Sequence, residues 1–513
     1  MYRNKGTITV FLSLISMLFL SLFCTMAESV RGQSSRCQAA AAFDMGLFSI
    51  FGEYDRVLLE EYDLWFLDGS SEEQKIREVL ETKLEKYIQP NINPRYNLAA
   101  GRSWDVFPTE LDRCTVDKYA LATDHGGQVF YSQAVENQKE LFVGEAASAL
   151  KKNIKQMEEG HQKGEEYQNE EQKADEEYQR AQAAQMEEKK RQESEKENAE
   201  KQEESDTDIK ETEAVQAKVE NPLDQIKKIK SMGILGLVLK DGTVVSDKTI
   251  ERKDLPSERN LQKGSLLVDE ISADPVSEAI FLNYLQKHFQ CAVDEGGKHQ
   301  KGSKEHSLSY ELEYIIGGQK SDRENLKKTV NRILLIREGM NYATLAKSAK
   351  MRGEAMALAA AITGAAALPE FAGALQKLLM LAWAYGESLL DVRTLLAKGK
   401  VPMLKAETEW KLPLEKLGML AEVLKECDAG GGNGQSYEDY LSGLLILGKK
   451  QQRNLRVLDL IECNRRMEKG GETFRVDALV AQAEASADFE LAPVFLRVPA
   501  VWLHVRNQGT DYT

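Results

Sequence analysis

The chain has 513 residues, 42% of them hydrophobic and 29% charged, with a formal net charge of −15. This length is enough for two or three domains, and the hydrophobic content is enough for a packed core. Because no basic stripe is present to neutralise phosphates, the composition argues against nucleic acid as a partner.

An uncharged run of 21 residues, Thr7–Ala27, follows a short basic tip. At 1.5 Å per helical residue it spans about 30 Å, which is the thickness of the hydrocarbon core of a bilayer. Arg3 and Lys5 precede the run and Glu28 follows it, so the positive-inside rule places the N-terminus in the cytoplasm. The sequence therefore predicts a single-pass protein of the cell membrane, with membrane lipid as a partner and the C-terminal bulk outside the cytoplasm.

Two other interpretations of this run stay open. It could be a secretory signal cleaved after Ala27, since Thr25-Met26-Ala27 is an acceptable site, although the apolar part of a signal is usually shorter, about 7–15 residues. A lipoprotein anchor at Cys24 is less favoured, because bulky Phe23 stands where a small residue is needed.

One face of the apolar helix gathers small and weakly polar side chains, which would let a second helix approach closely. That face predicts contacts with other membrane or pilin-like proteins. The other interpretation is that the hydroxyls only bond to carbonyls of their own helix. The face consists of Thr9, Ser13, Ser16, Cys24 and Ala27.

The helical period continues past the membrane run, which predicts one long helix that is embedded first and then packs amphipathically on a soluble domain. Gly32, Gly46 and Gly52 are positions at which that helix could bend or end. The predicted apolar stripe is Cys37, Ala41, Phe48, Phe51, Leu58, Tyr62 and Trp65.

Residues 53–68 form a near-repeat with six carboxylates, a set that in principle could bind calcium. Eight helical residues turn through about 80° beyond two full turns, so the two copies face different ways, and a solvated acidic face is the better prediction. A helix is expected over residues 71–88 and irregular structure over 93–145.

Residues 151–220 carry 22 acidic and 13 basic side chains, and no Leu, Ile, Val, Phe or Trp occurs between Met157 and Ser205. Without an apolar seam these residues are not expected to form a coiled coil. We expect a solvated helix or a disordered segment that acts as a spacer and does not pack on the rest of the protein.

From residue 221 the composition is globular again. Lys240–Thr243 between apolar runs predicts a hairpin, and the alternation over residues 308–316 predicts a half-buried strand. Ser321 and Glu324 form a capping box that starts a helix, with further helices after it.

The uncharged run Ala355–Leu368 is too short for a second membrane span and predicts a close-packed helix that ends at Pro369. Phe371–Leu396 is expected to be the helix that packs against it. Ser436, followed by Asp439 three residues later, is expected to cap a helix that reaches about Met467. A strand is expected over residues 474–480, and further β structure is expected in about the last 25 residues.

These elements predict an α+β, helix-rich fold. It has a single N-terminal transmembrane helix that extends into a long amphipathic helix, and a mixed α/β ectodomain interrupted by the charged helical or disordered spacer. The predicted parts are a basic leader (1–6), a transmembrane helix (7–27), a membrane-proximal helix and mixed region (28–150), a charged low-complexity spacer (151–220) and a C-terminal α+β domain (221–513).

No motif in the sequence marks a catalytic, metal or cofactor site. No two of the six histidines stand three or four residues apart, and no G-x-S-x-G, H-E-x-x-H or Walker loop is present. His288 and Cys291 could pair as base and nucleophile, but catalytic pairs are usually distant in sequence. We therefore predict that the protein is not an enzyme and has no cofactor. The six cysteines are scattered without a C-x-x-C, which favours free thiols over a disulfide framework or a zinc site.

Residues 5–15, KGTITVFLSLI, resemble the class III leader region of TadE/TadG-like minor pilins of Tad pili, and Arg36–Ala42 resembles the Gln-Ala-Ala-rich helix that follows in that family. The resemblance implies cleavage after Gly6, so that the mature chain begins at Thr7. The chain departs from the pattern at Phe11, where pilins carry a Glu that pairs with a neighbouring subunit. This difference fits an accessory or tip component better than a repeating subunit.

More of the chain resembles a family of uncharacterised membrane proteins of anaerobic Gram-positive bacteria. This resemblance covers nearly the whole chain apart from the charged segment, and that family has no settled function. The segments that carry it are 43–55, 331–338, 381–388, 437–441 and 458–462.

Three functions follow as hypotheses. The first is a membrane-anchored extracytoplasmic accessory protein of a Tad-like pilus or secretion apparatus. The second is a cell-envelope scaffold or adhesin with a simple uncleaved anchor, and the third, less favoured, is a surface hydrolase. Neighbouring genes for a prepilin peptidase and a secretion ATPase would favour the first.

Overall fold

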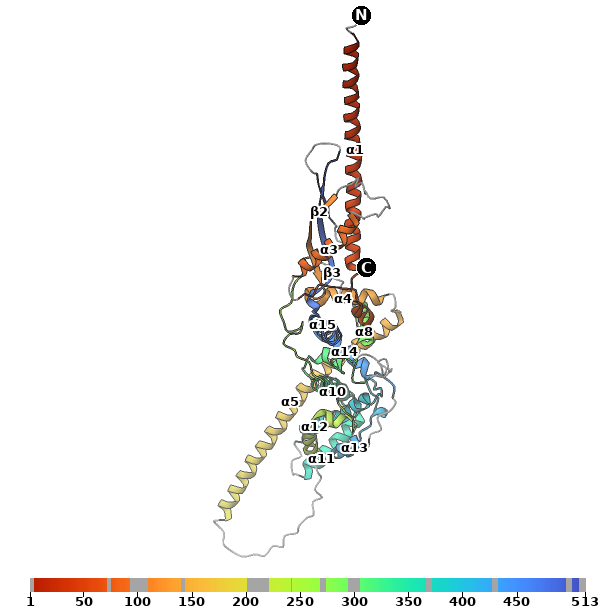
Figure 1. Ribbon diagram of the computed structural model, residues 1–513. Helices are drawn as coiled ribbons and strands as arrows, with labels where there is room; N and C mark the ends of the chain where they lie inside the picture. Colours follow the sequence, from red (N-terminus) through yellow and green to blue (C-terminus); the bar gives the residue numbers. More distant parts are fainter. Residues whose placement is uncertain are drawn as a thin grey trace. The chain divides into compact units, whose positions relative to one another are not determined.

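The computed structural model describes residues 4–71, 75–92, 109–139, 144–200, 221–240, 242–267, 274–293, 305–365, 371–426, 432–494 and 501–506. It is helix-rich with a smaller antiparallel sheet, which confirms the predicted α+β class (Figure 1). Two compact units are present. Unit 1 is Met1–Leu141, Glu251–Ala273 and Asn454–Thr513, and unit 2 is Phe142–Ile250 and Asp274–Arg453. Each unit is assembled from separate stretches of sequence, so the units do not coincide with contiguous parts drawn from composition.

Unit 1 begins with α1 (Asn4–Phe51), a continuous helix of 48 residues that confirms the predicted long helix. It passes through Gly32 and Gly46 and ends before Gly52. The uncharged run and the packed part are therefore two halves of one rigid element.

The packed side of α1 is set by Gly46, whose missing side chain lets α3 (Ile76–Ile92) approach. A Cβ at Gly46 would lie only 2.7 Å from Ile88 Cγ1. The stripe predicted through Cys37 and Phe48 is therefore wrong, since Cys37 is exposed and Phe48 is 69% exposed. The buried apolar residues of this half are Ala39, Ala42, Phe43, Leu47 and Ile50.

An antiparallel sheet forms the other side of this core. Strand β3 (Leu479–Leu491) is central and pairs along its length with β2 (Thr109–Leu121). It also pairs with β1 (Leu67–Asp68) near its start and with β4 (Val501–Arg506) near its end. The apolar side chains of α3 recur every four residues, as a helix with one buried face requires. These residues are Ile76, Leu80, Leu84, Ile88 and Ile92.

Carboxylates of residues 53–68 build a turn in unit 1. Asp55 caps α2 (Arg56–Tyr62) by accepting hydrogen bonds from two backbone amides, and Asp63 ends that helix in a left-handed conformation. Asp55 Oδ2 also lies 3.1 Å from Arg465 Nε on α15 (Lys450–Met467). The expectation of a solvated acidic face is therefore wrong for Asp55, because capping and ion pairing draw its side chain into the fold.

Other expectations for unit 1 need smaller corrections. Helix α3 begins at Ile76, later than predicted, and the irregular structure expected over 93–145 is replaced by β2 and α4 (Asp124–Lys139) where the chain is described. Residues 93–108 lie outside the described ranges. A 3-10 helix, η4 (Val476–Ala478), stands where the strand over 474–480 was expected, and the strand begins at Leu479. Strand β4 fits the β structure expected near the C-terminus.

Unit 2 contains α5 (Gly144–Glu200), which covers most of the charged segment. Its first half packs on α10 (Asp322–Lys347), α12 (Ala372–Leu396) and α14 (Tyr437–Leu447), so the prediction of an unpacked spacer is wrong there. Residues 201–220 lie outside the described ranges. The packing surface uses small residues, one methionine and one tyrosine at steps of three, four or seven, in place of branched aliphatic side chains. Its members are Met157, Gly160, Gly164, Tyr167 and Ala174.

Two β predictions in unit 2 are wrong. The apolar run before the expected hairpin at 240–243 forms α7 (Ile234–Val238), and the expected strand over 308–316 is largely α9 (Glu311–Gly317). Every residue of α9 is buried, including Glu311 and Glu313. Their carboxylates accept hydrogen bonds from the amides of Gln290 and Ala292. The polar residues of this segment are therefore buried together with the apolar ones.

The remaining helices of unit 2 follow local signals more closely. Ser321 caps α10 by accepting a hydrogen bond from the Glu324 amide, which confirms the predicted helix start. Ser436 caps α14 as predicted and forms a capping box with Asp439. The helix expected to run from Ser436 to Met467 is instead two, α14 and α15, and α14 is followed by Gly448. Helix α11 (Ala349–Ala365) packs on α12, as predicted, while Pro369 lies outside the described residues.

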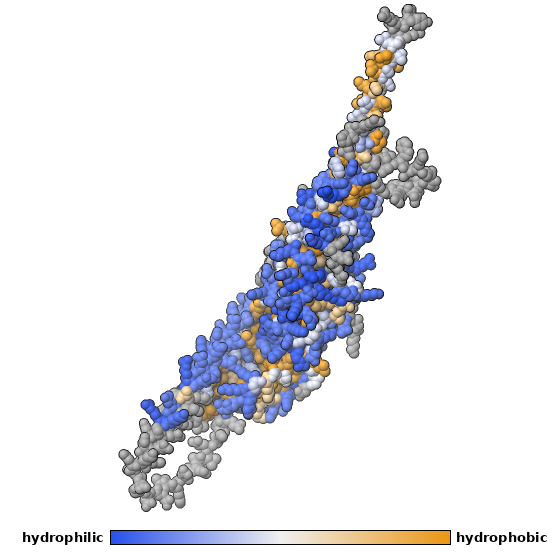
Figure 2. All heavy atoms as spheres, turned by 60° about the vertical axis from the view of Figure 1, so that its left-hand side comes forward, coloured by the Kyte–Doolittle hydropathy of each residue, from blue (hydrophilic) through white to orange (hydrophobic). Residues whose placement is uncertain are grey.

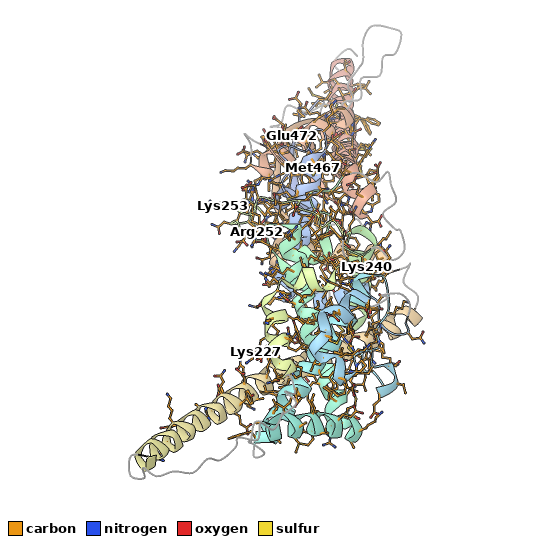
Figure 3. All side chains as sticks on the ribbon, turned by 90° about the horizontal axis from the view of Figure 1, so that it is seen from below. Lys227, Lys240, Arg252, Lys253, Met467 and Glu472 are labelled. Carbon is orange, nitrogen blue, oxygen red and sulfur yellow. The ribbon has the colours of Figure 1, made fainter. Side chains whose placement is uncertain are left out.

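Unit 2 also contains several shorter elements. On α6 (Pro222–Ser231) the buried side is Pro222, Leu223, Ile226 and Ile229, while Lys227 is exposed to solvent (Figure 3). The others are α8 (Pro275–His288), η2 (Glu407–Glu409), η3 (Leu414–Met419) and α13 (Leu420–Glu426).

Candidate functional site: the exposed half of the N-terminal helix

Residues Gly6–Ala27 of α1 carry a largely apolar surface that no other described part of the chain covers (Figure 2). Phe11, Leu18 and Phe23 are 65%, 67% and 67% exposed. Soluble proteins rarely expose apolar surface on this scale unless it meets a membrane or another protein. Among the described residues, α1 is the one helix long and apolar enough to cross a membrane, although a signal sequence near an N-terminus has the same properties.

The five residues of the predicted helix-packing face all lie on this half of α1, and all are exposed except half-buried Cys24. Ser13 Oγ donates a hydrogen bond to the carbonyl of Val10 at 2.8 Å, and Thr25 Oγ1 donates to that of Ser21 at 2.8 Å. The helix itself therefore satisfies these hydroxyls, so they can face an apolar environment at little cost. Contact between this face and a second helix stays a prediction.

The predicted processing position lies at the start of the same helix. Gly6 is exposed, and a Cβ built on it would meet no atom within 4 Å. Cleavage between Gly6 and Thr7, which lie in the first turns of α1, stays a prediction.

The exposed half of α1 ends where hydrogen bonds tie the helix to the chain that leaves β3. Arg31 is 3% exposed, pairs with Glu28, and donates from Nη2 to the carbonyl of Ala492 at 2.6 Å. Glu28 also accepts from the amide of Val494 at 3.4 Å. The chain that leaves β3 is thus held beside the first charged residues after the apolar run.

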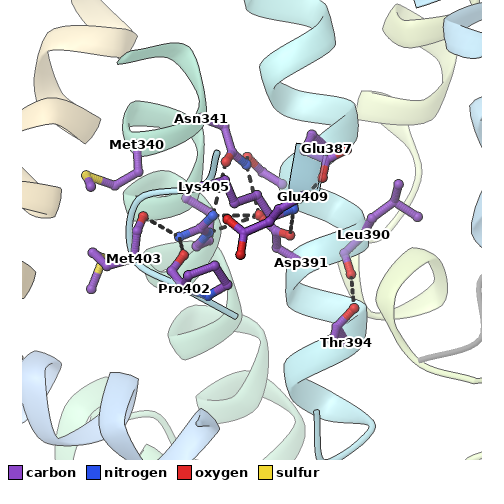
Figure 4. Close-up of polar contacts among 12 residues, drawn as sticks. Met340, Asn341, Glu387, Leu390, Asp391, Thr394, Pro402, Met403, Lys405 and Glu409 are labelled. Carbon is purple, nitrogen blue, oxygen red and sulfur yellow. Dashed lines mark hydrogen bonds and ion pairs between the residues drawn. The ribbon is translucent and has the colours of Figure 1, made fainter. Parts of the chain in front are cut away.

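Unit 2 contains a buried charged cluster between α10 and α12 (Figure 4). Arg337 donates through Nε and Nη2 to Asp391 Oδ2, at 3.0 and 2.8 Å. Lys405 Nζ lies 2.5 Å from Asp391 Oδ1 and also pairs with Glu387. Asn341 donates to Asp391 at 2.9 Å. The cluster links two helices to the loop that carries Lys405.

Electrostatics within this cluster favour a structural role. Burial acts to raise the pKa of Asp391, but the charges of Arg337 and Lys405 outweigh it and hold that pKa below its usual value. Burial raises the pKa of Glu387, with Lys405 opposing the change. Arg337, Glu387 and Asp391 are fully buried, so no dissolved substrate reaches them.

Unit 1 has a second cluster of this kind. Arg259 Nη1 lies 2.6 Å from Glu462 Oε1, and its Nη2 lies 2.5 Å from Asp477 Oδ1. Burial opposes the charge on Arg259, but both carboxylates outweigh that effect and raise its pKa. The cluster fastens the segment around Arg259 to α15 and η4, and both acids are fully buried.

His288 and Cys291, the candidate base and nucleophile, each contact another residue in the described part of the chain. The ring of His288 lies 4.6 Å from that of Tyr284, whereas Cys291 Sγ donates to the carbonyl of Val293 at 3.1 Å. No group of three His, Cys, Asp or Glu side chains could hold a metal ion among the residues described. Five cysteines there are thiols, and Cys427 lies outside the described ranges.

An open hollow of about 400 Å³ lies beside α7, where Lys240 is labelled in Figure 3. Its charged groups include Arg323 and Asp247, which form a pair at 3.1 Å with both side chains mostly exposed. This pairing does not present a nucleophile with a base, so the hollow offers no recognisable catalytic arrangement.

Sequence reasoning missed the buried clusters. The available signal was a charged residue within an apolar helical run, such as Arg337 after Ile333–Ile336, or Glu387 and Asp391 within α12. Such residues are almost never fully buried unless they are paired. Their partners come from distant parts of the chain, so the sequence alone does not pair them.

These observations define a helix-rich α+β protein with one exposed apolar helix near its N-terminus and charged clusters sealed in its folded units. The chain belongs to a family of unknown function, DUF5702, whose model matches residues 212–491. This match confirms a resemblance to a family of unknown function for the segments within residues 212–491. Segment 43–55 and the pilin-like N-terminal residues lie outside it. No curated protein and no solved structure matches the chain.

Proposed function

We propose that residues 7–27 of α1 anchor this protein in the cell membrane and that it serves outside the cytoplasm as an accessory component of a Tad-like pilus or secretion apparatus. The observation that carries the proposal is the division of α1. Its first half is apolar and exposed, while its second half is packed into the core of unit 1. A bilayer, or a bundle of similar helices within one, is the environment that covers such a surface.

The proposed orientation rests on charge. Arg3 and Lys5 stand before the apolar run, and Glu28 is the first charge after it. Basic residues are retained on the cytoplasmic side, so the N-terminus stays in the cytoplasm and the folded units are exported.

The accessory role rests on the pilin-like motif and on its departure at Phe11. A pilin Glu at that position would pair with a neighbouring subunit, whereas Phe11 carries no charge and is 65% exposed. Such a side chain suits lateral contact with lipid or with an apolar helix. The chain would then join an assembly through α1 without repeating along a filament.

Mass spectrometry of the N-terminal peptide from the native host, for the wild type and Gly6→Val, tests the processing that this role implies. A mature start at Thr7 in the wild type, lost in the variant, supports the proposal. An intact N-terminus in both favours the envelope scaffold with an uncleaved anchor. A start at Glu28 would show that the apolar run is a removable signal and would overturn the anchor.

Protease treatment of intact protoplasts that carry a C-terminal tag tests the orientation. We expect the tag to be degraded while a cytoplasmic marker protein survives. A protected tag would contradict the extracytoplasmic placement.

The helix face can be tested with a matched pair of variants. Ser13→Leu combined with Ser16→Leu keeps the span apolar but fills the small-residue face, whereas Leu18→Ile changes the opposite side of the helix. We expect cross-linked pilin-like membrane proteins to be recovered with the wild type and Leu18→Ile but not with the double variant. Equal recovery in all three would remove the role assigned to this face.

A further inference from the structure

A hairpin of unit 1 ends beside the membrane-proximal end of α1. Leu491, the last residue of β3, pairs with Val501, the first residue of β4. A Cβ built on Gly32 would lie 4.0 Å from a methyl carbon of Leu491, and Arg31 binds the carbonyl of Ala492. The open end of this strand pair is therefore fixed next to the start of the packed half of α1.

The position of this end relative to a bilayer follows from helix geometry. Gly32 stands five residues after Ala27, which corresponds to about 7 Å along the helix axis. A headgroup layer is about 5–8 Å thick on each side of the hydrocarbon core. If Ala27 marks the end of the span, Leu491 and its neighbours lie at the level of the headgroups.

Three exposed apolar side chains gather at that level. Val494, Val501 and Trp502 are 54%, 42% and 59% exposed. Val494 is tied to the helix through its amide, which donates to Glu28. Trp502 pairs with Glu490 in the β3–β4 register, one step from the Leu491–Val501 pair.

Polarity changes along the same face of β4. His504, two residues beyond Trp502, lies 2.7 Å from Asp488, and Arg506, two further on, pairs with Glu484 at 3.4 Å. At about 3.3 Å per residue, the strand thus passes from an exposed indole to ion pairs within about 13 Å. An aromatic ring at the boundary with charged groups behind it is the pattern of a membrane interface.

We propose that Val494, Val501 and Trp502, where β3 ends and β4 begins, form a second membrane contact within the headgroup layer of the phospholipid bilayer that α1 spans. The inference rests on the proposed anchoring, because the bilayer level is set by Ala27. Its partner is lipid, since these residues stand at the level set by the end of the span and an indole places an apolar body and a polar N–H at one boundary. The contact would prevent unit 1 from tilting about the single span.

The chain supplies a matched control tryptophan. Trp65 is 48% exposed and also belongs to unit 1, but it stands just before β1, which pairs with the opposite end of β3. From Val480, the partner of Leu67, to Leu491 the strand extends about 36 Å. A membrane that reaches Trp502 therefore leaves Trp65 in water.

The test is quenching of tryptophan fluorescence in full-length protein reconstituted into phosphatidylcholine vesicles with bromine near the upper end of the acyl chains. Subtracting the spectrum of Trp502→Phe from that of the wild type isolates Trp502, and Trp65→Phe isolates the control. We expect the Trp502 signal to fall about twofold or more in brominated vesicles, as for a ring at the interface, and the Trp65 signal to be unchanged. Equal thermal unfolding of the three proteins shows that the fold is retained.

Sedimentation of the vesicles separates the two proposals. If all three proteins pellet with the vesicles but the Trp502 signal is not quenched, the hairpin contact is overturned while the anchor stands. If the wild type does not pellet after detergent removal, both proposals are overturned. Equal quenching of Trp65 and Trp502 would also overturn the contact, because it would place the whole sheet at the bilayer.

Discussion

Gly339 on α10 lies so close to Gly164 on α5 that a Cβ built on Gly339 would be 2.3 Å from the Gly164 amide nitrogen. The two helix backbones meet directly at this crossing, since neither residue interposes a side chain. The contact explains how a helix rich in Glu, Lys and Gln packs on unit 2.

Gly339→Ala should therefore destabilise the protein by about 3 kcal/mol or more, because backbone must move to admit the methyl group. Gly353→Ala is the control: Gly353 is exposed in α11 and a Cβ there would meet no atom within 4 Å. It should stabilise the helix by about 0.5–1 kcal/mol. Urea unfolding measures both, and equal effects would show that the crossing is not close-packed.

Asp391→Asn should destabilise unit 2 by about 3–5 kcal/mol. The substitution keeps the size of the side chain but removes the carboxylate that pairs with buried Arg337, and it leaves Lys405 paired with Glu387 alone.

A control for that substitution is Asp247→Asn, which breaks a pair with Arg323 whose side chains are 78% and 58% exposed. Solvent screens such a pair, so the change should be below about 1 kcal/mol. Chemical denaturation of the two variants side by side distinguishes these cases. A loss of similar size in both would mean that the buried cluster contributes no more than a surface pair.

Glu338 should make stability fall as pH rises. Burial raises the pKa of Glu338 from 4.5 to about 8, with a smaller contribution from Glu171, and Lys230 opposes the rise. Between these pH values the folded protein holds a proton that the unfolded chain has released, so folding weakens as pH increases through this window. Below about 4.5 both states are protonated and the effect vanishes.

Glu338→Gln removes this titration. The change in the free energy of unfolding between pH 5 and pH 8 should then be smaller than in the wild type, by about 3 kcal/mol. Glu354→Gln, on an exposed part of α11, should leave the dependence as in the wild type. Unfolding curves across the range provide the measurement. An unchanged slope in Glu338→Gln would show that this carboxyl is not the group responsible.

The thiols should differ in reactivity in the native protein. Burial raises the pKa of Cys114 to about 12 and that of Cys463 to about 12, which suppresses the reactive thiolate as well as access. Cys37 is exposed on α1. N-ethylmaleimide at neutral pH should label Cys37 first, and all three only after denaturation, as peptide mass spectrometry would show. Rapid native labelling of Cys114 would contradict its burial.

Local features of the sequence predicted the elements that depend on local forces. The uncharged run and the continuing helical period specified α1, and the hydroxyls of Ser321 and Ser436 marked helix starts because capping bonds reach only a few residues. The predicted apolar stripe of α1 lies on a different side of the helix from the one that is buried, because the buried side is set by the contact between Gly46 and Ile88.

The sequence by itself therefore determined that a long apolar helix precedes a helix-rich α+β protein. The tertiary structure alone decided that α5 packs through Gly164 and that Glu311 and Glu313 are buried in a helix. It also decided that Arg337 forms an ion pair with Asp391. The physical reason is range: capping and periodicity act within a few turns, whereas close backbone contact and charge compensation join residues that are distant in the chain. A glycine or a buried charge is interpretable only when its partner is known.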